Sequence, residues 1–130
     1  MNKFTIHGDC EIKVEGNIVH INLEGPFNIE FFSFMHKELL AIGDQINKDH
    51  YAVILSPKGE AVIVDQAFKY HTDFLLQRTP KAVAINLENC ETKVVTESIC
   101  EKIYQQAGIN HQFFNSHQQA LHWLNNDVLA

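Results

Sequence analysis

The side chains with the reactivity for chemistry are eight histidines, three cysteines and a carboxylate at the start of a predicted helix. In the segment "VIVDQAFKYH", an apolar run ends at Asp65 and helical spacing begins. A helix N-terminus favours negative charge, so an anion or a phosphorylated hydroxyl is stable there. Asp65 is itself a preferred N-cap residue, and we expect its carboxylate to bond the free amides. Because Gln66 offers no hydroxyl, the junction predicts neither a phosphorylation site nor an open anion site.

The histidines and cysteines are spaced poorly for a metal centre or for thiol catalysis. No predicted helix carries an H-x-x-x-H pair and the sequence has no C-x-x-C, whereas structural zinc sites normally use such short spacings. Cys90 precedes a helix, whose N-terminus lowers a thiol pKa, but Glu88 and Glu91 act in the opposite direction. We therefore expect no metal and no cofactor, with Cys10, Cys90 and Cys100 as packing or loop residues.

His71 has two interpretations. It lies on the apolar face of a predicted helix, and Arg78 follows two turns later on the same face. As functional groups, the two would form a polar pair that points into a pocket between the helix and a sheet. As structural groups, His71 would be packed with one ring nitrogen hydrogen-bonded, and Arg78 would cover the helix C-terminus. The structural interpretation is favoured.

Sequence motifs of hydrolases and nucleotide-binding enzymes are missing. The chain contains no G-x-S-x-G, no P-loop and no G-x-G-x-x-G. Ser56 ends a predicted strand, but Pro57 and Lys58 follow it and predict a turn instead of a nucleophile elbow. We therefore expect a non-enzymatic protein.

Alternating strands and helices must position these residues. Residues 10–14 and 19–23 alternate apolar and polar around Gly16-Asn17, which predicts a β-hairpin. Phe4 and Ile6 add a short strand before it. Asn28 opens a first helix, and its apolar stripe consists of Phe32, Met35, Leu39, Ile42 and Ile46.

The rest of the chain repeats a strand-helix pattern. Buried strands are predicted at residues 51–56 and 82–87, where Ala82 and Ala84 allow a helix to approach closely. The second helix ends before Pro80. The predicted elements that follow are a helix over residues 92–107 with Val95, Ile99 and Ile103 inward and Gly108 as its C-cap, a strand at 111–114, and a last helix capped by Ser116.

The element order predicts a single α/β domain over residues 1–130. We expect a mixed, mostly parallel sheet with an N-terminal antiparallel hairpin and four covering helices. The net charge of −6 argues against nucleic acid as a partner, and no apolar stretch is long enough for a membrane span. An odd number of cysteines and the lack of an N-terminal signal pattern indicate a cytoplasmic protein.

This order, with a hairpin first and "FFNSHQQALHWL" last, resembles the SpoIIAA-like and STAS-like proteins, a group of small bacterial domains. The resemblance covers about residues 10 to 125, and its other specific segment is Gln77-Arg78 before "AVAINL". In anti-sigma antagonists of this fold, an Asp-Ser pair followed closely by Gly opens the second helix, and a partner kinase phosphorylates the serine. Asp65 matches that Asp, but Gln66 replaces the serine and Ala67-Phe68 replace the residues around Gly. The resemblance thus implies the scaffold without the phosphorylation switch.

The first functional hypothesis is a binding module that engages a protein partner. Ligands of open α/β sheets bind beyond the carboxyl ends of the strands, and STAS-like domains offer the same rim to partners. The residues that the sequence places there are Phe27, Lys58, Asp65, Gln66 and Lys69. The exposed edge of the hairpin also favours a homodimer.

The alternative is a carrier of a small apolar, lipid-type ligand. The fold is also similar, more loosely, to lipid-carrying CRAL-TRIO domains. Phe31, Phe34 and Met35 would line a cavity between the first helix and the sheet, with His71 as a polar contact. Phe34 points about 120° away from the apolar stripe, so it is either a partner or ligand contact, or a flank residue packed against a loop.

Overall fold

The computed structural model describes residues 8–61, 63, 65–77 and 79–130. The strand predicted at Phe4 and Ile6, the side chain of Arg78 and the capping carboxylate of Asp65 lie outside the described part. The sheet order is β1-β2-β3-β4-β5, with β1 antiparallel to β2 and every other pair parallel. The strands are β1 (Asp9–Glu15), β2 (Ile18–Glu24), β3 (Ala52–Lys58), β4 (Val83–Asn86) and β5 (His111–Phe114). The predicted mixed sheet with an N-terminal hairpin is confirmed.

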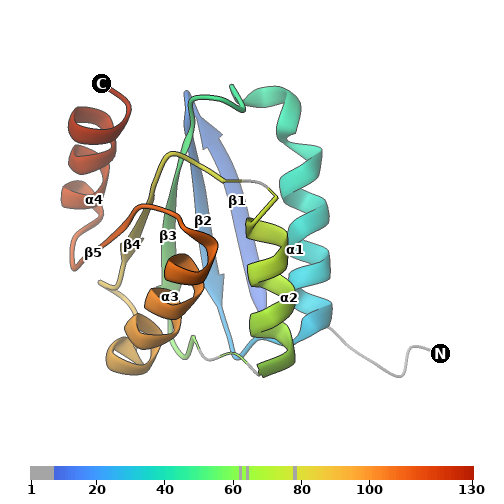
Figure 1. Cartoon of the computed structure of the whole chain (residues 1–130). Helices are drawn as coiled ribbons and strands as arrows, with labels where there is room; N and C mark the ends of the chain where they lie inside the picture. Colours follow the sequence, from blue (N-terminus) through green and yellow to red (C-terminus); the bar gives the residue numbers. More distant parts are fainter. Residues whose placement is uncertain (1–7, 62, 64, 78) are drawn as a thin grey trace.

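Helices cover both faces of this sheet, as Figure 1 shows. Three helices lie on one face, and the fourth lies on the other. The helical segments are α1 (Ile29–Ala41), a 3-10 turn η1 (Gly43–Gln45), α2 (Asp65–Leu75), α3 (Lys93–Ala107), α4 (His117–Trp123) and a π-helical turn η2 (Leu124–Val128).

Strand alternation divides the buried residues into two cores. Val53 and Leu55 of β3 face α1, α2 and α3, whereas Ala52 and Ile54 face α4. Successive side chains of a strand point to opposite faces, so each central strand contributes to both cores. The small side chains predicted to admit a helix do so, since Ala82 and Ala84 are fully buried in the core that contains Ala120 and Leu124.

The helix caps predicted at Asn28, Gly108 and Ser116 are confirmed. Asn28 Oδ1 accepts a hydrogen bond from the Phe31 amide at 3.0 Å, which satisfies a free N–H at the start of α1. Ser116 Oγ accepts from the Gln119 amide at 3.3 Å at the start of α4. Gly108 ends α3 with φ +69°, the left-handed region that glycine adopts without strain.

The turn predicted at Pro57-Lys58-Gly59 was placed too early in the chain. Pro57 and Lys58 continue β3, and the chain turns at Gly59, where φ is +59°. The Val53 amide donates to Ala82 O on the β4 side. Because amides four residues apart on a strand point the same way, an amide at position 57 would also point toward the β4 side. The paired residues of β3 and β4 end at Leu55, and a proline is therefore tolerated where its missing N–H costs no ladder bond.

The inward face of α3 differs from the apolar stripe that was predicted. Val95 is 50% exposed, and the buried positions are Thr96, Cys100, Ile103, Tyr104 and Ala107. Ile103 is buried and Ile99 packs against the core, as predicted. The prediction for Val95 was wrong because it counted only apolar residues, whereas Thr96 is buried with its hydroxyl bonded. Thr96 Oγ1 donates to Ala61 O at 3.2 Å and lies 2.9 Å from Thr92 Oγ1.

Replacing Thr96 with valine should destabilise the protein, because the shape is kept while buried partners lose their hydrogen bond. The expected loss is about 1–2 kcal/mol in the free energy of unfolding, measured by urea denaturation. Val95→Thr, the reverse exchange at the exposed neighbouring position, is the matched control and should change stability by less than about 0.5 kcal/mol. Equal effects of the two exchanges would contradict the role given to Thr96.

Candidate functional site

The predicted partner rim lies at the carboxyl ends of the parallel strands. Lys58, Gln66 and Lys69 are exposed there, and Lys69 Nζ forms an ion pair with Asp73 Oδ2 at 3.1 Å. Phe27 is only 6% exposed, and its ring packs against Phe31 at a centroid distance of 4.6 Å. The expectation for Phe27 therefore needs correction, since a partner on this rim would meet its neighbours and not its ring.

Hydrogen bonds tie the loops of this rim together. The Gly25 amide donates to Glu60 O at 2.8 Å, and the Gly59 amide donates to Asn89 O at 3.1 Å. The Glu91 amide in turn donates to Gly59 O at 2.8 Å. Cys90 lies beneath these loops, 4% exposed, with its Sγ 3.4 Å from Thr96 Oγ1.

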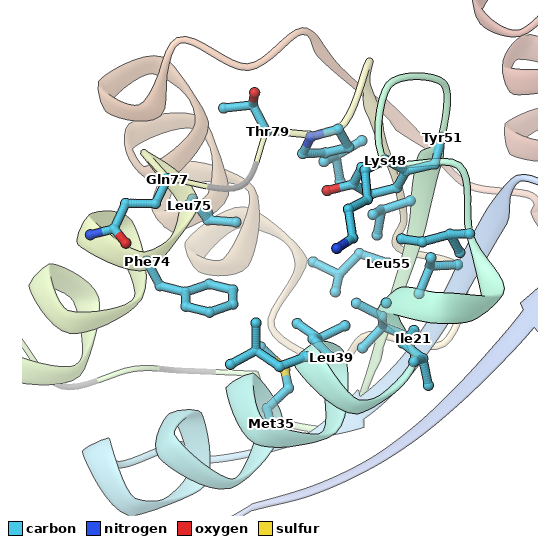
Figure 2. A pocket seen from close by; sticks show the side chains of 18 of the residues that line it. Ile21, Met35, Leu39, Lys48, Tyr51, Leu55, Phe74, Leu75, Gln77 and Thr79 are labelled. Carbon is cyan, nitrogen blue, oxygen red and sulfur yellow. The ribbon is translucent and has the colours of Figure 1, made fainter.

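A large pocket opens at the opposite edge of the sheet, at the amino ends of the parallel strands. Its volume is about 450 Å³, within the range of roughly 300–1,000 Å³ typical of small-molecule sites. Its walls come from the second half of α1, η1 and the chain that leads to β3, and the end of α2, as Figure 2 shows. Its floor is the face of the sheet formed by β2, β3 and β4.

Most of the pocket lining is apolar. The buried residues Val19, Ile21, Met35 and Val83 are each at most 4% exposed, and Phe74 points into the hollow (Figure 2). Among the described residues, the aliphatic and aromatic lining consists of Val19, Ile21, Met35, Leu39, Leu40, Ile42, Ile46, Tyr51, Val53, Leu55, Phe74, Leu75, Pro80, Val83 and Tyr104. Such a surface favours the apolar part of a ligand.

The mouth of the pocket is more polar. Lys48, Gln77 and Thr79 are exposed lining residues, and Leu40 beside them is 49% exposed. Lys48 is the one charged residue among those that line the pocket within the described chain. In Figure 2 its ammonium nitrogen points toward the hollow.

The early end of α1 accounts for the hollow. The predicted stripe continued through Ile42 and Ile46 as one helix, but α1 ends at Ala41 and the chain enters η1. Ile46 has an extended backbone with φ −124° and ψ 153°, so it leaves the helical face and becomes part of the pocket wall. On the other side α2 ends at Leu75, which leaves the sheet surface between the two helix ends open.

The carrier hypothesis predicted the place of the cavity better than its lining. Met35 and His71 line the pocket as expected. Phe31 and Phe34 do not, because Phe31 is fully buried against Phe27 and Phe34 is 38% exposed on the outer side of α1. The residues that the hypothesis missed include Tyr51 and Phe74, together with Leu39 and Tyr104. The signal for Leu39 was its place in the apolar stripe.

His71 combines the two interpretations that its sequence position allowed. Its Nδ1 lies 2.9 Å from His36 Nε2, and its ring stacks on Phe32 at a centroid distance of 4.6 Å. The same side chain, 8% exposed, lines the pocket. Arg78, its predicted partner, lies outside the described residues.

Both histidines of this pair are uncharged at neutral pH. Burial, followed by the charge of His36, lowers the pKa of His71 to about 3, and burial lowers the pKa of His36 to about 4. One imidazole therefore donates and the other accepts in the bond between them. His36 also stacks on Phe74 at 3.7 Å between centroids, so the pair is held between aromatic rings.

The thiols of Cys10 and Cys100 are held in their protonated form. Burial, followed by the charge of Asp9, raises the pKa of Cys10 to about 11. Burial, followed by the effect of Cys90, raises the pKa of Cys100 to about 12. These two protonated thiols are poor nucleophiles. None of the three cysteines forms a disulfide.

A comparison with solved structures found a protein that is similar to this one over nearly the whole chain. An uncharacterised protein of the DUF3478 family with a SpoIIAA-like fold, from Shewanella loihica PV-4, superposes with a TM-score of 0.63 at 14% sequence identity. The alignment covers 95% of this chain and 98% of that protein. The chain has a SpoIIAA-like fold.

The SpoIIAA-like fold confirms the resemblance found in the sequence, and at this level of identity it concerns the fold alone. No protein-family model and no curated protein matches the chain. Among the described residues, no helix is long and apolar enough to cross a membrane.

Proposed function

We propose that this SpoIIAA-like protein is a non-enzymatic binding module that holds a small, mainly apolar molecule in the pocket between α1, α2 and the sheet. The observation that supports the proposal is the hollow of about 450 Å³ with a lining of mostly aliphatic side chains. An apolar molecule that enters this hollow would remove its own apolar surface and that of the lining from water, which favours binding.

The polar groups of the pocket support binding more than a reaction. The described lining contains no carboxylate and no cysteine. His71 is the one imidazole among these residues, and its Nδ1 is taken by His36. General acid–base catalysis and covalent catalysis need a group that is poised to exchange a proton or to attack, beside a suitable partner. An uncharged His71 with a pKa of about 3 is a weak base for that task.

The proposal is tested with purified protein. Native mass spectrometry should show a co-purifying apolar molecule, or the apo protein should bind one equivalent of the uncharged fluorescent dye N-phenylnaphthylamine with increased emission. A clean apo mass together with no increase in dye emission would remove the carrier function.

A protein partner at the opposite rim is the second candidate. The exposure of Lys58, Gln66 and Lys69 at one edge of the sheet favours it. Charge reversal by Lys69→Glu breaks the ion pair with Asp73 and should reduce the partners captured from the native cell. A variant that retains every partner captured by the wild-type protein would count against this rim.

A further inference from the structure

Two buried polar side chains face the pocket without a complete set of partners. Tyr104 is 5% exposed and His71 is 8% exposed, and both line the hollow. Within the described residues, every fully buried side-chain nitrogen or oxygen has a hydrogen-bond partner. No bond joins the Tyr104 hydroxyl to another described residue, so its oxygen is not fully buried, and its side chain lines the hollow.

The bond to His36 leaves His71 Nε2 free to contact a ligand. If His36 Nε2–H donates to His71 Nδ1, then His71 carries its proton on Nε2 and presents a donor. If His71 Nδ1–H donates instead, Nε2 presents an acceptor. The pair can therefore match a ligand that offers either a carbonyl or a hydroxyl.

The Tyr104 hydroxyl has the same versatility. Burial raises its pKa well above the ordinary value, so the hydroxyl keeps its proton and remains able to donate as well as accept. A pure hydrocarbon in the pocket would remove water from these atoms without forming a hydrogen bond to them, which is unfavourable for buried polar groups.

We propose that the ligand is an apolar chain that carries an uncharged hydroxyl or carbonyl oxygen, and that the Tyr104 hydroxyl binds this oxygen with His71 Nε2 as a second polar contact. The inference rests on the proposed function and gives it a chemical class, namely fatty alcohols, ketones and related neutral molecules. The inner polar groups are uncharged, and Lys48, the one charged lining residue in the described chain, lies at the exposed mouth.

The test compares octanol with chlorooctane, which has a similar shape but lacks the hydroxyl. Displacement of N-phenylnaphthylamine gives the affinity of each ligand for the wild-type protein and for Tyr104→Phe. Each ligand is compared between the wild-type protein and the variant. The free energy of its transfer out of water is the same in both measurements and therefore cancels. The variant should bind octanol about fivefold to tenfold more weakly, since one hydrogen bond is lost, while its affinity for chlorooctane stays the same or rises.

A second measurement does not depend on the variant. The nitrogen NMR resonance of His71 Nε2 should shift when octanol binds to the wild-type protein and should shift much less with chlorooctane. Circular dichroism establishes that Tyr104→Phe is folded before its affinities are compared.

Three outcomes would overturn the inference. One is an equal change in affinity for both ligands in Tyr104→Phe, and another is a His71 resonance that responds alike to both. The third is tighter binding of octanoate than of octanol with the difference erased by Lys48→Met, which would place an anionic group at the mouth. All three leave the pocket function intact, whereas a wild-type protein that binds neither the dye nor any ligand contradicts the proposed function itself.

Discussion

Leu39→Trp is expected to weaken the binding of an apolar ligand by roughly fiftyfold. Leu39 is a half-buried residue of α1 that lines the pocket, so an indole at this position has open space to enter. If the ring displaces about three methylene groups of the ligand at roughly 0.8 kcal/mol each, the loss is about 2.4 kcal/mol. Dye displacement with the wild-type protein and the variant measures this difference.

The stability of the variant separates a filled pocket from a damaged fold. Overpacking destabilises a dense core, but filling a pre-existing hollow does not force neighbours apart. Leu39→Trp should therefore unfold at a urea concentration equal to or above that of the wild-type protein. Val94→Trp adds the same ring at a position of α3 that is 83% exposed and outside the pocket, and it should leave binding unchanged. Full ligand affinity in Leu39→Trp would contradict the assignment of this hollow as the binding site.

Periodicity predicted most of the elements because burial in this sheet follows strand alternation closely. Ala52 and Ile54 face one core while Val53 and Leu55 face the other, and an unbroken apolar run such as "YAVILS" is the expected sequence of a strand covered on both sides. The caps at Asn28 and Ser116 were predictable for the same local reason, since they depend on residues within one helical turn.

The pocket was less predictable because it depends on where helices stop. Ile42 and Ile46 continue the helical spacing of Met35 and Leu39 in the sequence, and only the end of α1 at Ala41 moves them from a helix face to a pocket wall. Gly43, directly after the C-cap residue Ile42, is the type of residue that marks a helix end, but the prediction gave more weight to the apolar spacing. Tyr104, which also lines the pocket, lies at least 63 positions after α1 along the chain, and no local pattern joins the two.

The expectation of a site at the carboxyl ends of the strands rests on a general property of open α/β sheets. In this chain, main-chain bonds between Gly25 and Glu60, and between Gly59 and Asn89, connect the loops of that edge. The hollow lies instead at the amino ends, where α1 and α2 both stop short. The two candidate functions therefore use opposite edges of one sheet, and variants at Leu39 and at Lys69 test them independently.

Acid should destabilise this protein through the buried pair of His36 and His71. The folded pKa values of about 4 and about 3 lie below the ordinary value of 6.5, so the unfolded chain binds protons that the folded chain does not. Stability is therefore unaffected above about pH 6.5 and falls as the pH decreases toward the folded values. Each excluded proton costs up to about 1.4 kcal/mol per pH unit, which gives roughly 3 kcal/mol for His71 between about pH 6.5 and pH 4.5. His36 adds a slightly smaller amount because its folded pKa of about 4 lies closer to the ordinary value.

Removal of His71 should reduce this loss of stability in acid. In His71→Phe, the loss of unfolding free energy between about pH 7 and pH 4.5 should be smaller than in the wild-type protein by about 2–3 kcal/mol, because one excluded proton is gone. Urea denaturation at both pH values measures the loss. The substitution also removes a hydrogen bond, but that effect is present at both pH values and cancels when the two values are subtracted for each protein. His122→Gln exchanges an exposed histidine of α4 and should lose as much stability in acid as the wild-type protein. If His71→Phe and His122→Gln gave the same pH dependence, the buried pair would not be the source of the acid sensitivity, and His71 would be accessible to protons in the folded protein.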